Sequence, residues 1–391
     1  MRPAKEKILI VSPTVPRPDM NSGDLRLYSL IVVLAKEKEI SFVSMSCRPG
    51  DDAYVSLLEQ CGVKVYLESF SLWKLLKREN FKAAILEFYF TAEYYIGRIR
   101  ILQPDCRLIV DSVDVHYLRL QLKYELTKDE ADLAIYRETK ERELAVYCKA
   151  DAVITVTLDD ACAIRAECPD ILCEVVPNTH HLCLSDTPPE RDTLIFVGGF
   201  SHDPNVDAVR HFCTDILPLI RESKPNIRLT IVGNNPPENI RLLENEHVTV
   251  TGYVPETSPY LHRSHVSVAP LRYGAGMKGK IGEAMAHGIP VVTTVVGAQG
   301  MGLAHGKNVM IADSPRCFAA AVLELLEDKR LWETIRGNAV QIIEDNYTPK
   351  QVGQALLDAL ESIYTKPIMR YPVFIIYNHF IFVTVFFSIF L

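Results

Sequence analysis

The chain has 391 residues, a formal net charge of −7 and 48% hydrophobic residues. This length exceeds what a single hydrophobic core usually organises, so two domains are expected. The sequence has no basic arm or patch dense enough to neutralise a phosphate backbone, which excludes nucleic acid as an expected partner. We therefore expect small-molecule ligands.

The first half reads as a doubly wound α/β domain with a parallel sheet, because apolar runs alternate with helical stretches. Its first strand is followed by a proline-rich loop and by a helix whose apolar residues recur from Leu25 to Leu34. Charge-dense, helix-period residues at 118–150 predict one or two long surface helices. The predicted strands are 7–12, 40–45, 63–66, 83–88, 107–111, 152–157 and a short one that ends at 176–178.

The pattern then starts again after a polar run at 186–192 that contains two prolines and predicts a linker. We predict two Rossmann-like domains, residues 1–185 and 186–349, followed by a helix at 350–365. Ligands of open parallel sheets lie beyond the carboxyl ends of the strands, so a nucleotide is expected in the cleft between the domains. Strands of the second half are predicted at 193–199, 228–232, 247–251, 266–269, 291–294 and 309–311.

The ten cysteines contain no Cys-x-x-Cys pair, and no signal sequence precedes the first strand, so we predict a reduced, cytoplasmic setting. Four of them gather near His180 and His181, as ligands of a zinc site can. Their spacing matches no zinc motif, and no metal is predicted there. These four cysteines are Cys162, Cys168, Cys173 and Cys183.

The segment 372–391 differs from the rest, since residues 373–391 contain no Asp, Glu, Lys or Arg. That length can span a bilayer. Lys366 and Arg370 precede it and favour a cytoplasmic N-terminal side. Three interpretations stay open. One is a membrane anchor, which would hold the protein at the inner face of the cell membrane. The others are a hydrophobic strand pair and a non-native tail produced by a shifted reading frame or a truncation of a longer chain.

The most informative motif follows the predicted strand 266–269. Gly274 and Gly276 allow close approach of the backbone to a ligand, and the free amides of the next helix favour an anion. Lys278 and Lys280 add cationic donors at the same end. Glu283 lies one turn further, where its carboxylate can accept two hydrogen bonds from a ribose diol. A tight turn into a capped helix with solvated lysines is the structural alternative.

This run resembles the signature of the retaining glycosyltransferases of family 4, Gly-x-Gly-x-Lys/Arg-x-Lys-x-x-Glu-Ala-Met-Ala-x-Gly-x-Pro-Val-Val. The resemblance covers about residues 7–364 and implies the glycosyltransferase B (GT-B) fold. Many members carry a second glutamate eight residues before the one that matches Glu283, whereas this chain has Ala275. We infer that backbone amides of the loop, which includes Met277, hold the donor sugar instead.

The loop after the first strand ends in Ser22-Gly-Asp24, which is similar to the Ser-Gly-Asp of the family. Amides of Ser22 and Gly23 are expected near the phosphate or the donor sugar. Asp24 and Arg26 are expected to face the acceptor. The alternative is a helix cap, in which Ser22 or Asp24 satisfies free amides.

The segment 111–119 resembles the family's Asp-x-x-Asp-x-His-x-x-Arg, which implies that His116 contacts the donor sugar. Asp114 and Arg119 are weaker candidates for the acceptor side. Asp111 and Asp114 are three residues apart, not in the Asp-x-Asp arrangement of metal-dependent glycosyltransferases, so no metal is predicted.

Further loops at strand ends of the second half are assigned to the donor site by the resemblance. Gly198 and Gly199 would approach the diphosphate, and the backbone of residues 252–254 would contact the base. Plain strand-to-helix turns explain these glycines equally well. The positions assigned in this way are Gly198, Gly199, Gly252, Tyr253, Val254 and Gly297.

The resemblance implies a retaining, metal-independent transfer of a sugar from a nucleotide-diphosphate sugar to a saccharide or lipid-linked acceptor. Polysaccharide or glycolipid synthesis is the expected pathway, and no cofactor is expected. Gly-x-Gly-x-x-Gly is absent after the first strand, which argues against a nicotinamide enzyme. Two alternatives stay open: a non-catalytic, membrane-tethered subunit that binds a sugar nucleotide, and a sugar-nucleotide epimerase or phosphorylase of the same fold.

Overall fold

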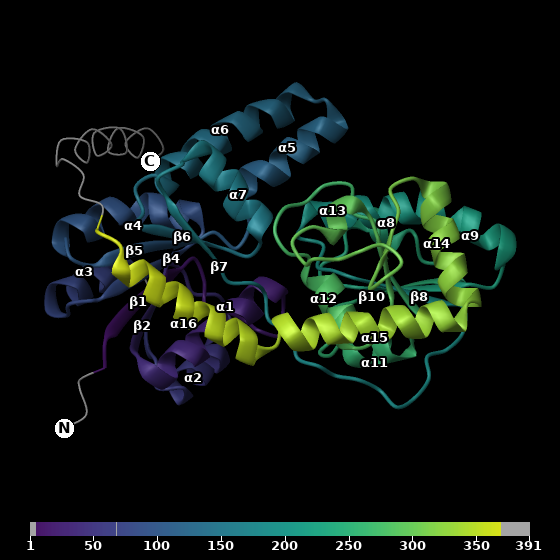
Figure 1. Ribbon diagram of the computed structural model, residues 1–391, viewed down its shortest axis with the longest axis horizontal. Helices are drawn as coiled ribbons and strands as arrows, with labels where there is room; N and C mark the ends of the chain where they lie inside the picture. The colour runs from purple at the N-terminus through teal and green to yellow at the C-terminus, as the bar shows by residue number, and fades with distance from the viewer. Residues whose placement is uncertain (1–4, 68, 369–391) are drawn as a thin grey trace.

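The computed structural model describes residues 5–67 and 69–368, which form two α/β domains side by side (Figure 1). The first domain contains a seven-stranded parallel sheet in the order β3-β2-β1-β4-β5-β6-β7. Its strands are β1 (Lys7–Ser12), β2 (Glu39–Ser44), β3 (Lys64–Leu67), β4 (Ala83–Glu87), β5 (Arg107–Asp111), β6 (Ala152–Thr155) and β7 (Leu172–Val175).

Helices cover both faces of this sheet and bury an apolar core on each. The long hairpin of α5 and α6 projects away from the sheet (Figure 1). Asn21, rather than Ser22 or Asp24, caps α1, since its side chain accepts from the amide of Asp24. The helices are α1 (Ser22–Glu37), α2 (Asp51–Gln60), α3 (Ser69–Arg78), α4 (Tyr89–Leu102), α5 (His116–Thr127), α6 (Glu130–Tyr147) and α7 (Leu158–Glu167).

The second domain repeats the plan with a six-stranded parallel sheet in the order β10-β9-β8-β11-β12-β13. Its strands are β8 (Thr193–Val197), β9 (Arg228–Val232), β10 (Val248–Gly252), β11 (Val266–Ala269), β12 (Val291–Thr293) and β13 (Met310–Ile311). Its helices are α8 (Asp203–His211), α9 (Leu217–Ser223), α10 (Glu238–Arg241), α11 (Ser258–Arg263), α12 (Gly279–Ala286), α13 (Val295–Ala298), α14 (Pro315–Glu327) and α15 (Lys329–Asn346), with a π-helical turn (Phe212–Ile216) between α8 and α9.

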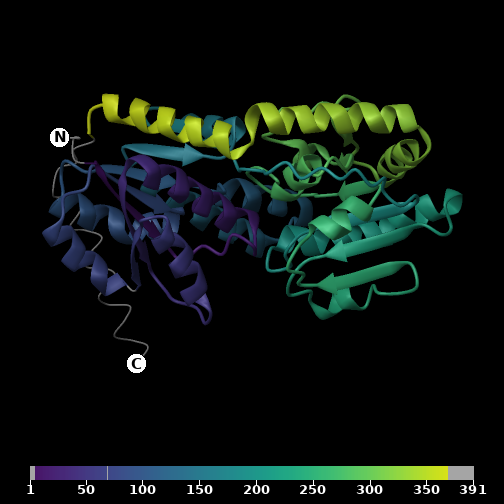
Figure 2. The ribbon, with the colours of Figure 1, turned by 90° about the horizontal axis from the view of Figure 1, so that it is seen from below.

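The last helix, α16 (Pro349–Thr365), returns to the first domain. Its apolar residues Val352, Leu356 and Leu360 join the core beneath α1. Arg107 Nη2 donates to the carbonyl of Tyr364 at 3.2 Å. Figure 2 shows α15 and α16 along one side of the molecule, each over a different domain.

The predicted fold class is confirmed, since every apolar run that predicts a strand is a strand of one of the two sheets. Parallel strands that are covered on both faces are apolar throughout, which makes these runs easy to recognise. Among residues 5–67 and 69–368, no helix is both long enough and apolar enough to cross a bilayer. The predicted anchor, 372–391, lies outside the described residues.

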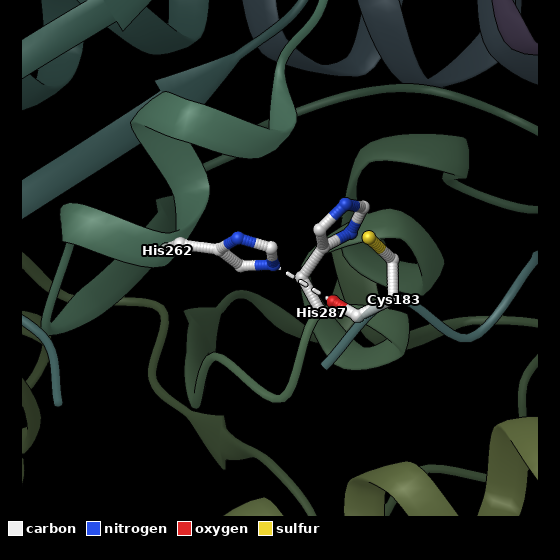
Figure 3. A group of neighbouring side chains, drawn as sticks. All are labelled: Cys183, His262 and His287. Atoms are coloured by element: carbon white, nitrogen blue, oxygen red, sulfur yellow. Dashed lines mark hydrogen bonds between the residues drawn. The ribbon is translucent and has the colours of Figure 1, made fainter. Parts of the chain in front are cut away.

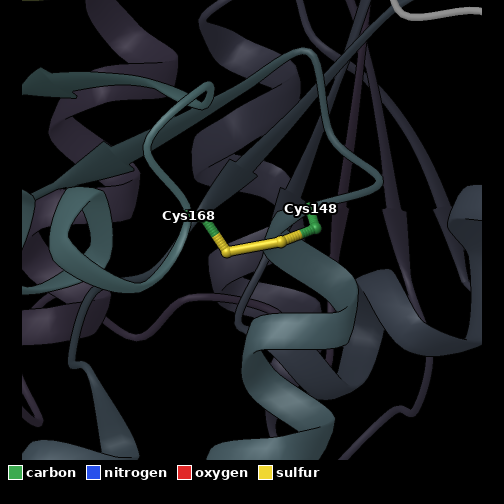
Figure 4. Close-up of a disulfide and its surroundings, with 2 residues drawn as sticks. All are labelled: Cys148 and Cys168. Atoms are coloured by element: carbon green, nitrogen blue, oxygen red, sulfur yellow. A yellow bond between two sulfur atoms is a disulfide. The ribbon is translucent and has the colours of Figure 1, made fainter.

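One pair of cysteines departs from the reduced setting that the sequence predicts. Cys148 and Cys168, at the C-terminal ends of α6 and α7, form a disulfide with a Cα–Cα distance of 6.3 Å (Figure 4). Two helix ends are brought together here by folding over a sequence separation of 20 residues, which cysteine spacing does not reveal.

Candidate functional site

A cavity of about 670 Å³ lies between the two domains at the carboxyl ends of their strands. It is the cleft that the fold prediction expects, and we call it the donor cleft. Twelve of the predicted site residues line it: Ser22, Gly23, Gly198, Gly199, Tyr253, Val254, Gly274, Ala275, Met277, Lys278, Lys280 and Glu283.

Glycines allow the loop between β11 and α12 to touch the first domain. Gly276 has φ +66°, and a Cβ there would lie 3.3 Å from the carbonyl oxygen of Val113. A Cβ on Gly279 would lie 2.5 Å from the Cβ of Ser22, closer than side chains approach. The N-terminus of α12 therefore lies directly opposite the N-terminus of α1, with their free amides at the same cleft.

The two lysines of the motif are held inside the donor cleft rather than solvated. Lys278 is 7% exposed and its Nζ donates to the carbonyl of Gly276 at 2.7 Å. Lys280 Nζ donates to Oδ1 of Asn205 at 2.6 Å and lies 5.4 Å from the centre of the Phe196 ring. Burial lowers the pKa of Lys278 to about 8, and burial together with the charge of Lys278 lowers the pKa of Lys280 to about 7.

Glu283 faces the same cleft from the next turn of α12. Its Oε1 accepts a hydrogen bond from the hydroxyl of Thr257, in the loop after β10. Burial raises the pKa of this carboxyl, and the Thr257 bond and the charge of Lys280 oppose the shift. Sequence reasoning missed Thr257, although its position five residues after the strand-ending Gly252 was a usable signal.

The loop after β8 places backbone and amide groups beside the lysines. A Cβ on Gly198 would lie 3.1 Å from Lys280 Cε, and a Cβ on Gly199 would lie 2.6 Å from Asn234 Oδ1. Asn234 was not predicted, although it follows β9 at the same edge of the sheet. Its Oδ1 is buried without a hydrogen-bond partner, so this acceptor is available to a ligand in the cleft.

His116 does not line the donor cleft, although Val113, three residues earlier, does. Its ring is surrounded edge-on by the rings of Phe88, Tyr89 and Phe90, and its Nδ1 lies 2.9 Å from the carbonyl of Asp114. The consecutive aromatics after β4 were a signal that sequence reasoning missed.

Glu143, on α6, fixes the start of α5 and was also missed. Its carboxylate accepts from the amides of His116 and Tyr117, at 3.1 and 2.9 Å. Burial alone would lower the pKa of His116, but the nearby Glu143 and Asp114 outweigh it and raise the pKa. The imidazole therefore sits in a prepared, negatively charged position next to the cleft.

The backbone is strained on both sides of this histidine. Phe88 and Val113 have φ of +63° and +53°, which is unfavourable for an aromatic and a β-branched residue. They follow neighbouring strands, since β4 pairs with β5 and the amide of Phe88 donates to the carbonyl of Asp111. Such strain persists where the surrounding structure compensates for it and is concentrated at functional sites.

The prediction that Arg26 faces the acceptor is wrong. Its side chain is 1% exposed and forms an ion pair with Asp111 at 2.7 Å, with further bonds to the carbonyl of Val176. Asp24 does not line the cleft either, because its carboxylate accepts from the amide of Arg17. Arg26 thus supports the interior of the first domain, and Asp24 holds the proline-rich loop before α1.

Five other predicted residues also lie outside the lining of the cleft. Asp114 and Arg119 pair with each other at 2.9 Å. Gly297 is buried in α13 against Thr293, where a Cβ would overlap the hydroxyl. The residues in this group are Asp114, Arg119, Gly252, Gly276 and Gly297.

Two Rossmann-like domains that enclose such a cleft define the GT-B glycosyltransferase architecture. Residues 191–328, which make up most of the second domain, match the family model described as Glycosyl transferases group 1.

Solved structures share the fold over nearly the whole chain. Sucrose-phosphate synthase from Thermosynechococcus elongatus is 15% identical with a TM-score of 0.70, covering 92% of this chain and 100% of that one. Anabaena HepE in complex with UDP and glucose is 16% identical with a TM-score of 0.69, covering 91% and 100%. These TM-scores show that the three proteins share a fold.

A curated relative from Klebsiella pneumoniae is described as an uncharacterized 44.6 kDa protein in a cps region. It is 26% identical over 168 residues, which are 41% of this chain. The match spans 43% of the length of that relative.

Proposed function

We propose that this protein is a retaining, metal-independent glycosyltransferase that moves a sugar from a nucleotide-diphosphate sugar to a saccharide or lipid-linked acceptor. One observation carries the proposal. Lys278, Lys280 and Glu283 meet two helix N-termini and the Gly198 loop in one interdomain cleft. This combination suits a diphosphate and a ribose diol at the same time.

In this reaction the bond between the anomeric carbon and the diphosphate oxygen breaks, and negative charge grows on the departing diphosphate. Ammonium groups of Lys278 and Lys280 and the amides that open α12 are the donors aimed at that charge. Preorganised donors of this kind act most strongly in a cleft that excludes water. Two buried cations can supply the neutralisation that a divalent metal supplies in other transferases.

The ligand-free lysines have pKa values near neutrality because burial disfavours their charged forms. A bound diphosphate favours the charged forms, so binding is expected to raise both pKa values and to take up protons. The free-energy cost of burying two charged lysines is thereby offset by two ion pairs with the donor.

The first domain supplies the acceptor side of the proposal. His116 lies in its aromatic surround next to Val113, which does line the cleft. Domain closure would bring His116 to the donor sugar, as the resemblance implies, and would exclude water. The proposed setting is cytoplasmic, at the inner face of the membrane, in polysaccharide or glycolipid synthesis.

The direct test measures release of nucleoside diphosphate from a panel of sugar nucleotides without added acceptor. UDP-glucose is the first probe, because HepE was solved with UDP and glucose. We expect slow release with one donor and at least tenfold less in Glu283→Ala. Release that is equal in both proteins would contradict the site assignment.

Ala275 favours a second candidate, a non-catalytic subunit that binds a sugar nucleotide, because no carboxylate occupies this position of the cleft. Such a protein would be stabilised against heat by the donor. It would release no nucleoside diphosphate from any of the donors, with or without a saccharide acceptor. An epimerase would instead change the configuration of the sugar in the recovered donor, which NMR detects.

A further inference from the structure

Three side chains that can ligate a metal come together behind the donor cleft, which His287 borders. Cys183 belongs to the connector between the two sheets, His262 to α11, and His287 is the C-cap of α12 (Figure 3). Cys183 Sγ and one nitrogen of each ring all lie within 4.8 Å of one another. We call this group the connector cluster.

Hydrogen bonds define the state of the His287 ring. Its Nδ1 lies 2.8 Å from the carbonyl oxygen of Glu283, and a carbonyl only accepts, so Nδ1 carries the proton. Nε2 is therefore unprotonated, and its lone pair accepts a hydrogen bond from the hydroxyl of Ser258 at 3.1 Å. Histidines that ligate metals show this same arrangement, with one nitrogen protonated and held by a carbonyl and the other free to bind.

The other two members are held in place by the backbone. His262 Nε2 donates to the carbonyl of Cys183 at 2.8 Å, as Figure 3 shows, and the amide of Cys183 donates to the carbonyl of Ala286 at 3.0 Å. The rings of His262 and His287 are 5.1 Å apart between centroids. Connector, α11 and the end of α12 are thus already aligned around one point.

A cavity of about 470 Å³ reaches the cluster from solvent, and His262 and His287 both line it. It provides an entry path for an ion and room for a water molecule. Within the part of the chain that the structure describes, no other three histidine, cysteine or carboxylate side chains bring their donor atoms this close together.

We propose that Cys183, His262 and His287 form a Zn²⁺ site, with water as the fourth ligand. A thiolate and two imidazoles are ligands that Zn²⁺ prefers, and its geometry is tetrahedral. Zn–N and Zn–S distances of about 2.0 and 2.3 Å place the ligand atoms about 3.5 Å apart. Separations of at most 4.8 Å must therefore shorten by up to about 1.3 Å. Side-chain rotation supplies this once the hydrogen bonds to Ser258 and to the Cys183 carbonyl are exchanged for coordination bonds.

The site would act on the donor cleft through α12. This helix carries Lys280 and Glu283, and its last carbonyls receive the hydrogen bonds of His287 and Cys183. A bound ion would tie the connector and α11 to the end of α12. Its role is structural and does not require contact with the diphosphate.

The test uses the full chain, stripped with a chelator and dialysed, with Zn²⁺ alone as the first probe and Co²⁺ as a spectroscopic one. We expect one equivalent of Zn²⁺ per chain, a higher melting temperature, and a near-ultraviolet band from thiolate-to-Co²⁺ charge transfer. Cys183→Ser should remove this band and weaken Zn²⁺ binding more than about 100-fold.

Two control variants match the test. His265→Ala removes an imidazole that lines the same cavity, and Cys317→Ser removes an exposed thiol. Both should keep full Zn²⁺ binding. His287→Gln should lose it while circular dichroism and an unchanged urea midpoint show that the variant is folded.

Either of two results would overturn the proposal: stripped wild-type protein that takes up no Zn²⁺, or Zn²⁺ binding that Cys183→Ser and His287→Gln leave unchanged. UDP binding by the zinc-free protein tests the donor site separately.

Discussion

The two edges of the donor cleft are built on opposite principles. The edge from the second domain gathers its chemistry within one short run, from Gly274 to Glu283, where glycines and a helix N-terminus place the lysines. The edge from the first domain assembles distant segments. There His116 depends on the aromatics after β4 and on Glu143 of α6.

The edge from the second domain is thus a local motif, whereas the edge from the first domain is a product of tertiary packing. Changes to the side chains of Lys278, Lys280 and Glu283 should alter binding and leave stability nearly intact. Changes at buried charges behind the other edge should do the reverse. Four predictions follow this contrast.

The largest effect is expected from Arg26→Ala, because it leaves the carboxylate of Asp111 buried without its ionic partner. Breaking such a pair lowers the free energy of unfolding by about 3–5 kcal/mol. Urea denaturation followed by circular dichroism measures this. Arg119→Ala is the control, since its pair with Asp114 is about one-fifth exposed and should contribute less. Unchanged stability with a higher KM for acceptor would restore the original prediction for Arg26.

Lys280→Ala should lower the rate of nucleoside diphosphate release by about 10² to 10³, as expected for removal of one preorganised donor. Its stability should change little, because Lys280 carries an unfavourable burial in the free protein. Rates at saturating donor measure the effect, with the exposed Lys307→Ala as control. Comparable losses in both variants would show that the effect is not specific to the cleft.

Glu283→Gln should weaken binding of UDP by about 10- to 100-fold, since hydrogen bonds to a charged group contribute about 1.5–3 kcal/mol. The sharper readout compares UDP with 2′-deoxy-UDP by calorimetry. Wild-type protein should prefer the ribose form, and the variant should lose that preference. Glu256→Gln, an exposed carboxylate lining the same cleft, should keep it. A preference that persists in Glu283→Gln would move the ribose contact elsewhere.

The smallest effect concerns pH. Burial lowers the pKa values of Lys280 and Lys278 to about 7 and about 8, and a bound diphosphate raises them. Affinity should therefore be highest below these values and fall as pH rises from 7 to 9, by up to about tenfold per unit for each proton. Lys280→Arg should flatten the profile, because a guanidinium stays charged. An affinity for UDP that does not change with pH in the wild-type protein would show that neither lysine forms an ion pair with the diphosphate.

Much of the fold could be predicted from the sequence, because buried parallel strands form apolar runs between turn residues. The run 274–283 could also be predicted, because its glycines, lysines and glutamate stand next to one another in the sequence. Arg26 could not, since its partner Asp111 is 85 residues away. The partnerships of Glu143 with His116 and of Thr257 with Glu283 also join segments that no local periodicity connects.

The cysteines also show that sequence spacing does not predict contacts between distant segments. Spacing alone gave no reason to pair Cys148 with Cys168, because the ends of α6 and α7 meet only after β6 and α7 have formed. Spacing equally gave no reason to join Cys183 with His262, which is 79 residues away. Sequence distance is a poor guide to both groupings, because folding brings their members together from separate elements.

The chain crosses between the domains twice, once in the connector after β7 and once between α15 and α16 (Figure 2). The two crossings are hydrogen-bonded to each other, since the amide of His180 donates to the carbonyl of Tyr347 at 2.7 Å. This hydrogen bond ties the two crossings together, in addition to the contacts that Gly276 and Gly279 make with the first domain. His180 also lines the cleft, so the joined crossings lie at its margin. A substitution that displaces the backbone of Tyr347 is therefore expected to reach the cleft through His180 without removing any group that faces a ligand.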